Sequence, residues 1–252
     1  MRGSPKRTLD PNMLHSEAHE PTRLTLEDVH AWYGESHVLH GVSLRIGSGQ
    51  VVSLLGRNGA GKTTTLRAIM GVIGKQSGSI TFDGRQLNNM PRHRIPRLGI
   101  GYVPDERGIF SSLTVDENLM LPPVVQPGGM ALEEIYQLFP NLLGRGGTRG
   151  TRLSGGEQQM LSIARILRTG CNMILLDEPS EGLAPALIQQ IGAAIRRLKT
   201  AGYTLLLVEQ NFKFAAAISD LHYVMEEGRI VDRFTSDEVG SNLSKLNSYL
   251  GI

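Results

Sequence analysis

The stretch Gly56-Arg57-Asn58-Gly59-Ala60-Gly61-Lys62-Thr63 matches G-x-x-x-x-G-K-[ST], the pattern of a phosphate-binding loop. The apolar run Val51–Leu55 precedes it and a helical pattern over residues 64–70 follows, so a strand delivers the chain to a helix N-terminus. There glycines let backbone N–H groups approach phosphates, and the helix dipole favours negative charge. We expect Lys62 to reach the β- and γ-phosphates and the Thr63 hydroxyl to bind Mg²⁺. A Gly-rich turn before an ordinary helix is the alternative, but the flanking elements favour a nucleoside triphosphate site.

Length and composition limit the classes of protein to consider. The 252 residues suit one large α/β domain, and 40% hydrophobic with 20% charged residues is typical of a soluble protein. A net charge of +2 gives no reason to expect a nucleic-acid partner. The single cysteine, Cys171, excludes an internal disulfide and a cysteine-based zinc site. Because no apolar stretch is long enough to span a bilayer and no signal-peptide pattern is present, we expect a cytosolic chain.

Hydrophobic patterning predicts one α/β domain. Residues 1–22 are polar and aperiodic, so we expect a disordered tail, followed by a domain over residues 23–252. Alternating apolar residues from Leu24 to Leu44 predict an antiparallel sheet, and residues 78–84 predict a strand ending in an Asp-Gly turn. Residues 111–170 should be mainly helical. Four continuous apolar runs predict strands buried on both faces of a parallel sheet: Val51–Leu55, Ile100–Val103, Met173–Leu176 and Tyr203–Val208.

Two carboxylates, Asp177 and Glu178, end the apolar run Met173–Leu176. Beside a phosphate-binding loop this is the Walker B arrangement, in which the first acid holds Mg²⁺ and the second polarises the attacking water. A buried strand that simply reaches the surface at charged residues would look the same. The presence of the loop favours the functional interpretation.

A second candidate anion site lies at Leu153-Ser154-Gly155-Gly156-Glu157. Ser154 and Glu157 have the spacing of a capping box at a helix start, which by itself explains the segment. Two glycines at that position would also expose backbone N–H groups at the positive helix end. A chain with one phosphate-binding loop has use for a second anion site only if that site acts on another molecule's nucleotide.

With these motifs in this order, residues 23–252 resemble the ATP-binding-cassette (ABC) ATPases, whose LSGGQ signature appears here as Leu153–Glu157. The resemblance implies a P-loop core with an antiparallel β subdomain and a helical signature subdomain over roughly residues 105–168. It also implies a head-to-tail dimer that sandwiches ATP and Mg²⁺, with Ser154 and Gly156 acting in trans. Nucleotide contacts are implied for Tyr33, Gly56, Arg57, Asn58, Gly59, Ala60, Gly61, Lys62, Thr63, Thr64, Ser154, Gly155, Gly156 and Glu157, metal contacts for Thr63, Asp105 and Asp177, and catalysis for Glu178, Lys62 and Gln210.

Three positions depart from the common family pattern, and one assignment has an alternative. Asp105 stands where most members have Gln, Gln210 where they have the switch His, and Ala184 where an Asp is frequent. Gln210 can hydrogen-bond a γ-phosphate oxygen, but it cannot carry positive charge or move a proton at neutral pH. Tyr33 resembles the residue that stacks on adenine, although a half-buried strand aromatic would look alike.

The segments Val-Pro-acid, Glu-Gly-Leu-Ala-Pro and Val-Glu-Gln-Asn together resemble the ATPase subunits of branched-chain and hydrophobic amino-acid importers. The implied partners are transmembrane permease subunits, a second ATPase subunit, identical or different, and indirectly a periplasmic or extracellular solute-binding protein. The chain would then sit at the cytoplasmic face of the plasma membrane. Importers of urea, cassette ATPases outside transport, and small-molecule kinases or GTPases are the alternatives. Neither a kinase nor a GTPase explains the Ser154–Glu157 segment.

Overall fold

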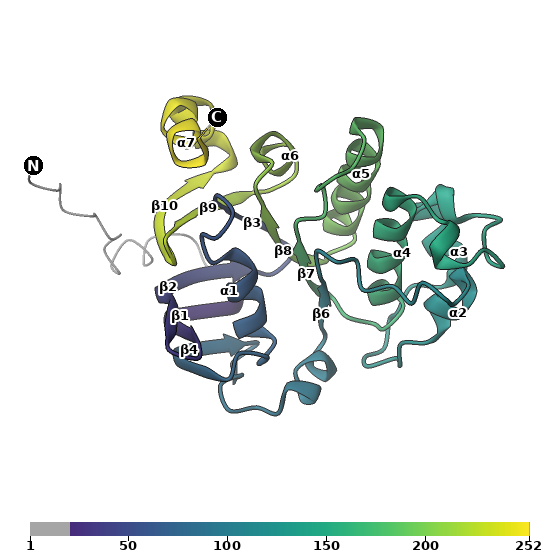
Figure 1. Cartoon of the computed structure of the whole chain (residues 1–252), viewed down its shortest axis with the longest axis horizontal. Coiled ribbons are helices and arrows are strands. Elements are labelled where there is room, and N and C mark those ends of the chain that lie inside the picture. Colours follow the sequence, from purple (N-terminus) through teal and green to yellow (C-terminus); the bar gives the residue numbers. More distant parts are fainter. Residues whose placement is uncertain (1–20, 252) are drawn as a thin grey trace, which may run out of the picture.

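The structure, a computed structural model, describes residues 21–251, so most of the tail expected over residues 1–22 lies outside it. Two sheets organise these residues (Figure 1). A four-stranded antiparallel sheet has the order β2-β1-β4-β5, and a six-stranded sheet has the order β10-β9-β3-β8-β7-β6. The strands are β1 (Thr22–Tyr33), β2 (Ser36–Gly47), β3 (Val51–Leu55), β4 (Lys75–Phe82), β5 (Arg85–Gln86), β6 (Ile100–Val103), β7 (Met173–Asp177), β8 (Thr204–Glu209), β9 (Leu221–Glu226) and β10 (Arg229–Thr235).

The six-stranded sheet confirms the predicted parallel core. β9, β3, β8, β7 and β6 pair in parallel, and β10 adds an antiparallel edge next to β9. The four apolar runs are β3, β6, β7 and β8, with β8 shifted by one residue to begin at Thr204. Leu55 of β3 pairs with Glu209 of β8, and Asp177 of β7 pairs with Val208. The carboxyl ends of the three central strands therefore meet at one edge.

Side-chain alternation along these strands separates two hydrophobic cores. On one face Leu55, Leu176 and Leu207 pack against the helices α4 to α7. On the other face Leu54 and Val208 pack against α1 and the antiparallel sheet. A strand buried on both faces must be apolar at every position, which is why these runs show no alternation in the sequence.

The helices follow the predicted pattern. Residues 111–170 form helices between β6 and β7, with one isolated bridge, and Pro185 stands at the first turn of α5 as expected. The helices are α1 (Lys62–Ile69), α2 (Val115–Met120), α3 (Leu132–Leu138), α4 (Gly155–Leu167), α5 (Pro185–Thr200), α6 (Phe212–Ala216) and α7 (Leu243–Leu250), with short 3₁₀ helices at Arg92–Arg94, Pro96–Leu98, Pro140–Leu142, Gly150–Arg152, Ser236–Glu238 and Gly240–Asn242. The subdomain boundary at residues 105–168 stays a prediction. Across residues 21–251, no helix is both long and apolar enough to cross a membrane.

Candidate functional site

An open cleft lies where β3 ends and α1 begins, and most of the phosphate-binding loop lines it together with Asp105 and Glu178. Backbone and side chains of the phosphate-binding loop form one wall, and acidic residues from two other loops face it. The lining residues are Val38, Asn58, Gly59, Gly61, Lys62, Thr63, Thr64, Asp105, Glu178 and Glu181. Residues more than 100 positions apart thus meet at the carboxyl edge of the parallel sheet, which is where α/β proteins bind ligands.

The backbone of the loop explains its glycines. Gly59 and Gly61 have φ values of 81° and 108°, in the left-handed region that glycine tolerates. Gly61 is the N-cap of α1, and no acidic residue occupies the first turn of that helix. A Cβ atom on Gly56 would lie 2.4 Å from the carbonyl oxygen of Met225. The loop can therefore follow a path that presents the N-terminus of α1 to an anion.

Lys62 is buried, and its ammonium group is held by the loop itself. Nζ donates to the carbonyl oxygens of Gly56 at 3.0 Å and Arg57 at 3.2 Å, and it lies 3.0 Å from Glu178 Oε1. Glu178 has a φ of 45°, a strained value for a residue with a Cβ, and its backbone N–H donates to Val208 of β8. The neighbouring Glu178 carboxylate, which can accept a hydrogen bond from protonated Glu181, is the main reason why the pKa of Glu181 is raised. The expected catalytic pair is thus in direct contact.

Asp177 connects the phosphate-binding loop to β6, the strand next to β7 in the sheet. Its fully buried carboxylate accepts a hydrogen bond from Thr63 Oγ1 on Oδ1 and one from the Tyr102 hydroxyl on Oδ2, both at 3.0 Å. Burial raises the pKa of Asp177, while these two hydrogen bonds oppose the shift. A hydroxyl beside a carboxylate, with the exposed Asp105 on the same cleft, is an oxygen donor set of the kind that Mg²⁺ prefers. The residues present therefore fit this metal.

Tyr102 had no role in the sequence analysis, and its environment connects two expected contacts. Burial is the main cause that raises its pKa, followed by the charge of Asp177. The guanidinium of Arg67 of α1 opposes this rise in the pKa of Tyr102, and the Tyr33 and Tyr102 hydroxyls in turn raise the pKa of Arg67. Tyr33 ends β1 with 45% of its surface exposed and lies outside the residues that line the cleft. A polar chain thus runs from the proposed adenine contact to the metal-site carboxylate.

Glu209 is the second residue that the sequence analysis missed. It ends β8, is 2% exposed, and precedes the expected catalytic residue Gln210, which is exposed. Its Oε1 accepts from the backbone N–H of Ser180 at 3.0 Å, and its Oε2 from that of Asn211 at 3.2 Å. Burial raises the pKa of Glu209 from 4.5 to about 7. A carboxylate at the end of an otherwise apolar strand is the sequence signal that could have identified it.

The signature segment forms the predicted capping box but lies outside the cleft. Ser154 Oγ accepts from the backbone N–H of Glu157 at 3.3 Å, and Glu157 Oε2 accepts from that of Ser154 at 2.8 Å. A Cβ on the buried Gly156 would lie 2.4 Å from Leu187 of α5, so packing also requires this glycine. Ser154 is exposed, and α4 lies across β6, β7 and β8 from α1 (Figure 1). One chain therefore does not bring the segment to its own phosphate-binding loop.

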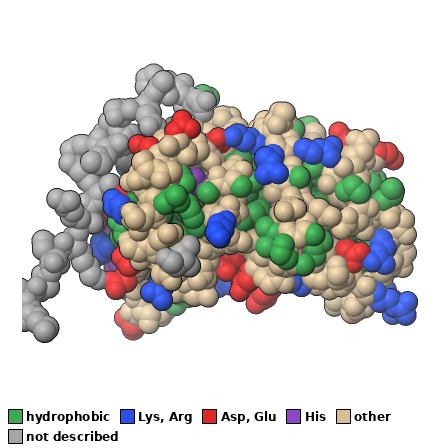
Figure 2. Space-filling model, turned by 90° about the horizontal axis from the view of Figure 1, so that it is seen from above, with side chains coloured by type: hydrophobic (Ala, Val, Ile, Leu, Met, Phe, Trp, Pro, Cys, Tyr) green, Lys and Arg blue, Asp and Glu red, His purple; other side chains and the backbone are tan. Residues whose placement is uncertain are grey.

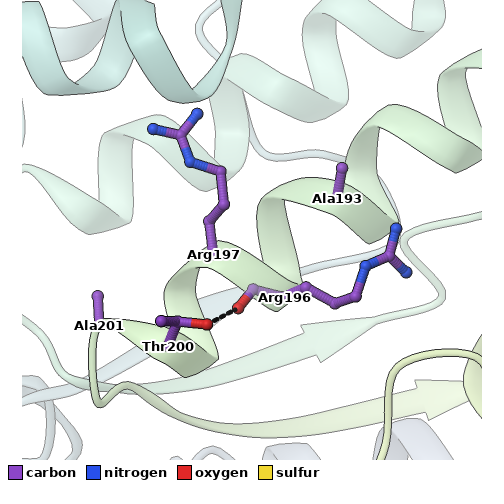
Figure 3. A pocket seen from close by; sticks show the side chains of 5 residues that line it. All are labelled: Ala193, Arg196, Arg197, Thr200 and Ala201. Atoms are coloured by element: carbon purple, nitrogen blue, oxygen red, sulfur yellow. Dashed lines mark hydrogen bonds between the residues drawn. The ribbon is translucent and has the colours of Figure 1, made fainter.

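Other surface features do not compete with this cleft. A shallow groove on α5 is lined by Ala193, Arg196, Arg197, Thr200 and Ala201 (Figure 3). Its two guanidinium groups point in different directions, and Arg197 donates to the carbonyl oxygen of Gln137 at 2.7 Å. Figure 2 shows acidic and basic side chains interspersed on the face seen from above.

Sequence comparisons show which proteins this chain is similar to. A model of the ABC transporter family matches residues 39–181. The high-affinity branched-chain amino acid transport ATP-binding protein BraG of Pseudomonas aeruginosa is 41% identical over 90% of this chain and 99% of its own. The probable branched-chain amino acid transport ATP-binding protein LivF of Archaeoglobus fulgidus is 34% identical over 84% and 91%. The lipopolysaccharide export system ATP-binding protein LptB of Haemophilus influenzae is 34% identical over 90% and 97%.

Solved structures agree with the sequence relatives. A nucleotide-free ATP-binding cassette from an ABC transporter has a TM-score of 0.80 and 26% identity, covering 92% of this chain and 99% of that one. A dimeric cassette in a post-hydrolysis state with ADP and phosphate has a TM-score of 0.74 and 25% identity, covering 84% and 98%.

Proposed function

The chain belongs to the ABC transporter family, and we propose that it is the ATP-binding and ATP-hydrolysing subunit of an importer for branched-chain amino acids. The observation that carries the proposal is the meeting of Lys62, Thr63, Asp177 and Glu178 at one cleft. The solute is proposed from BraG and LivF. LptB, an export protein, shares less sequence with this chain than BraG does, so we favour import.

Phosphate binding falls to the loop and α1. The positive-φ glycines Gly59 and Gly61 leave the backbone N–H groups at the helix N-terminus free of Cβ atoms. Thr63 and Asp177, with Asp105 at the rim, would hold Mg²⁺, which when bound offsets the charge of the phosphates. Tyr33 would stack on the adenine ring, for which its exposed face is suited.

Hydrolysis requires Lys62 and Glu178 to separate and to bind new partners. Lys62 contacts Glu178 at 3.0 Å, so it must leave the carboxylate to reach a phosphate oxygen. That exchange releases Glu178 to accept a hydrogen bond from the water that attacks the γ-phosphorus. The bond from phosphorus to the bridging oxygen breaks as the new bond forms. Gln210 would donate its amide N–H to a γ-phosphate oxygen.

The in trans role of the signature segment follows from its position. Ser154, Gly155, Gly156 and Glu157 lie at a helix N-terminus outside the cleft of their own chain, so they suit the nucleotide of a second cassette. Cassettes of this family act as dimers with transmembrane components. The second cassette would be another copy of this chain or a related ATPase subunit, and a solute-binding protein outside the membrane would supply the amino acid.

The permease contact is proposed at an exposed apolar surface of the helical segment. Phe110, Met120, Leu121 and Val124 are 48%, 60%, 51% and 70% exposed. Large apolar side chains exposed within one short segment are typical of a protein interface. This surface would hold the chain at the cytoplasmic face of the membrane.

The test is ATP hydrolysis by the purified full chain and by Glu178→Gln. If Glu178 is the general base, the variant should bind ATP but turn it over at least about 100-fold more slowly. Glu133→Gln, which alters an exposed carboxylate of α3, is the matched control and should keep the wild-type rate. Equal turnover in wild type and Glu178→Gln would contradict the assignment. Vesicles with the permease partners should take up leucine or valine, and uptake of urea in their place would correct the solute.

A further inference from the structure

The end of β8 carries a buried carboxylate that the hydrolysis scheme above does not use. Glu209 is 2% exposed and pairs across the sheet with Leu55, the residue before the phosphate-binding loop. Val208, its neighbour, pairs with Asp177 at the end of β7. Glu209 therefore stands at the carboxyl edge of the sheet, between β3, which leads to the phosphate-binding loop, and β7, which leads to Glu178.

Each oxygen of Glu209 holds a different loop. Oε1 accepts from Ser180, which is itself buried and lies two residues after Glu178. Oε2 accepts from Asn211, the N-cap of α6, which directly follows Gln210. Glu178 is also tied to β8 through its backbone N–H and the carbonyl oxygen of Val208 at 2.9 Å. One side chain thus joins the loop that carries Glu178 to the loop that carries Gln210.

We propose that Glu209 is a positioning residue for ATP hydrolysis, which holds the Glu178 loop and the Gln210 loop in one fixed arrangement. It acts through these two neighbours. The strained φ of 45° at Glu178 makes such a tie necessary, because a residue in the left-handed region returns to an ordinary conformation when its surroundings loosen. A displacement of about 1 Å of a catalytic group is enough to slow a reaction by about 100-fold. This inference rests on the ATPase activity proposed above.

The protonation state of Glu209 decides whether both of these hydrogen bonds form. As a carboxylate, Glu209 accepts hydrogen bonds from both backbone N–H groups. A proton on one of its oxygens would face the N–H group there, and that hydrogen bond would be lost. Its pKa is raised to about 7, chiefly by burial and to a smaller extent by the charge of Glu178, against the opposing Ser180 and Asn211 hydrogen bonds. Its partner on β3, Leu55, is apolar, and Glu178 is the charged group that acts on it. Turnover should therefore fall as the pH decreases through about 7.

The experiment compares wild type with Glu209→Gln, measuring kcat, KM for ATP and thermal unfolding between about pH 6 and 8.5. The amide keeps the shape but offers one acceptor oxygen, so we expect kcat at pH 8 to fall about tenfold with KM for ATP nearly unchanged. We also expect the acidic limb of the kcat profile to disappear. The double variant Glu209→Gln, Gln210→Ala should lose a smaller factor in kcat than the product of the two single losses, because Glu209 acts through Gln210.

The matched control is Asp232→Asn on β10, at the far edge of the same sheet. Asp232 is also a buried carboxylate with hydrogen-bonding and charged partners, namely Lys245, Tyr249 and the backbone N–H of Arg233, but it lies away from the cleft. This variant should unfold at lower temperature yet keep the kcat and pH profile of wild type. A Glu209→Gln enzyme with wild-type kcat and an intact acidic limb would overturn the proposal, as would a loss of kcat no larger than its unfolded fraction. Failure of the ATPase function itself would appear separately, as a wild-type rate no higher than that of Glu178→Gln, and would overturn both.

Discussion

Acid should remove the stability that one buried histidine, His222 of β9, contributes to this protein. The side chain is fully buried, its Nδ1 lies 2.6 Å from Ser53 Oγ, and its Nε2 has no hydrogen-bond partner among the described residues. The ring of Phe212 lies edge-on with centroids 6.4 Å apart. Burial lowers the pKa of His222 from 6.5 to about 4, and the charge of Asp220 only partly opposes this. The imidazole is therefore neutral in the folded state at pH values where the unfolded chain would protonate it.

The sign and size of the effect follow from this difference. The folded-state pKa is depressed, so the stability that His222 contributes is complete above pH 6.5 and is lost as the pH falls toward about 4. A difference of about 2.5 between the two pKa values corresponds to about 3 kcal/mol. Glu209 acts in the opposite direction, because its pKa is raised from 4.5 to about 7 and its penalty disappears as the pH falls over a similar range. The two contributions nearly cancel, so the wild-type stability alone does not reveal either one.

The measurement is therefore a difference between variants. Urea unfolding of wild type and His222→Gln, followed from pH 7.5 to about 4.5, gives the free energy of unfolding of each. Glutamine does not titrate and can still hydrogen-bond Ser53, so the advantage of wild type over the variant should shrink by about 3 kcal/mol across that range. Glu209→Gln should drift by a similar amount in the opposite direction. A constant difference between wild type and His222→Gln would refute a buried, neutral His222.

Three further predictions concern the cleft. Tyr33→Ala should weaken binding of a fluorescent ATP analogue about tenfold while Tyr33→Phe keeps it, since base stacking contributes about 1–3 kcal/mol; equal affinities would contradict stacking. Tyr102→Phe removes a donor 3.0 Å from the buried Asp177 carboxylate. It should lower the free energy of unfolding by about 2 kcal/mol, and an unchanged urea midpoint would show that this hydrogen bond contributes nothing. Lys62→Ala and Ser154→Arg should each be inactive alone, but an equal mixture should recover about a quarter of the wild-type rate, because half of randomly formed dimers contain one intact site. No recovery on mixing would rule out action in trans.

The parts of the site that the sequence predicted are those encoded by short contiguous patterns. The phosphate-binding loop, the acidic end of β7 and the capping box at Ser154 each need only a few neighbouring residues, and all three have the expected local structure. The buried strands were equally predictable from the sequence, because a strand covered on both faces is apolar at every position. The hairpin of β9 and β10 was not predicted. Its strands mix polar and apolar residues, since β10 is an edge strand with one exposed face.

The contacts that the sequence could not predict join distant segments. Tyr102 reaches Asp177 across 75 positions because β6 and β7 are neighbours in the sheet. Glu209 reaches Ser180 because β7 and β8 are parallel and end at the same level. Neither residue forms part of a motif whose spacing carries a mechanism. Sheet order determines both contacts, and sheet order is not visible in local patterning.

The same sheet order explains why we expect this cleft to bind a divalent cation together with the phosphates. Parallel strands bring their carboxyl ends to one edge, so acidic residues that end or follow separate strands accumulate there. Among the residues that line the cleft, Asp105, Glu178 and Glu181 are acidic and Lys62 is basic, and buried Asp177 lies just beneath. The Lys62 charge is already shared with Glu178 at 3.0 Å. A triphosphate that enters this cleft meets a local excess of negative charge, which the loop's backbone N–H groups offset only in part. Mg²⁺ held by Thr63 and Asp177 would thus offset the negative charge of the protein as well as that of the phosphates.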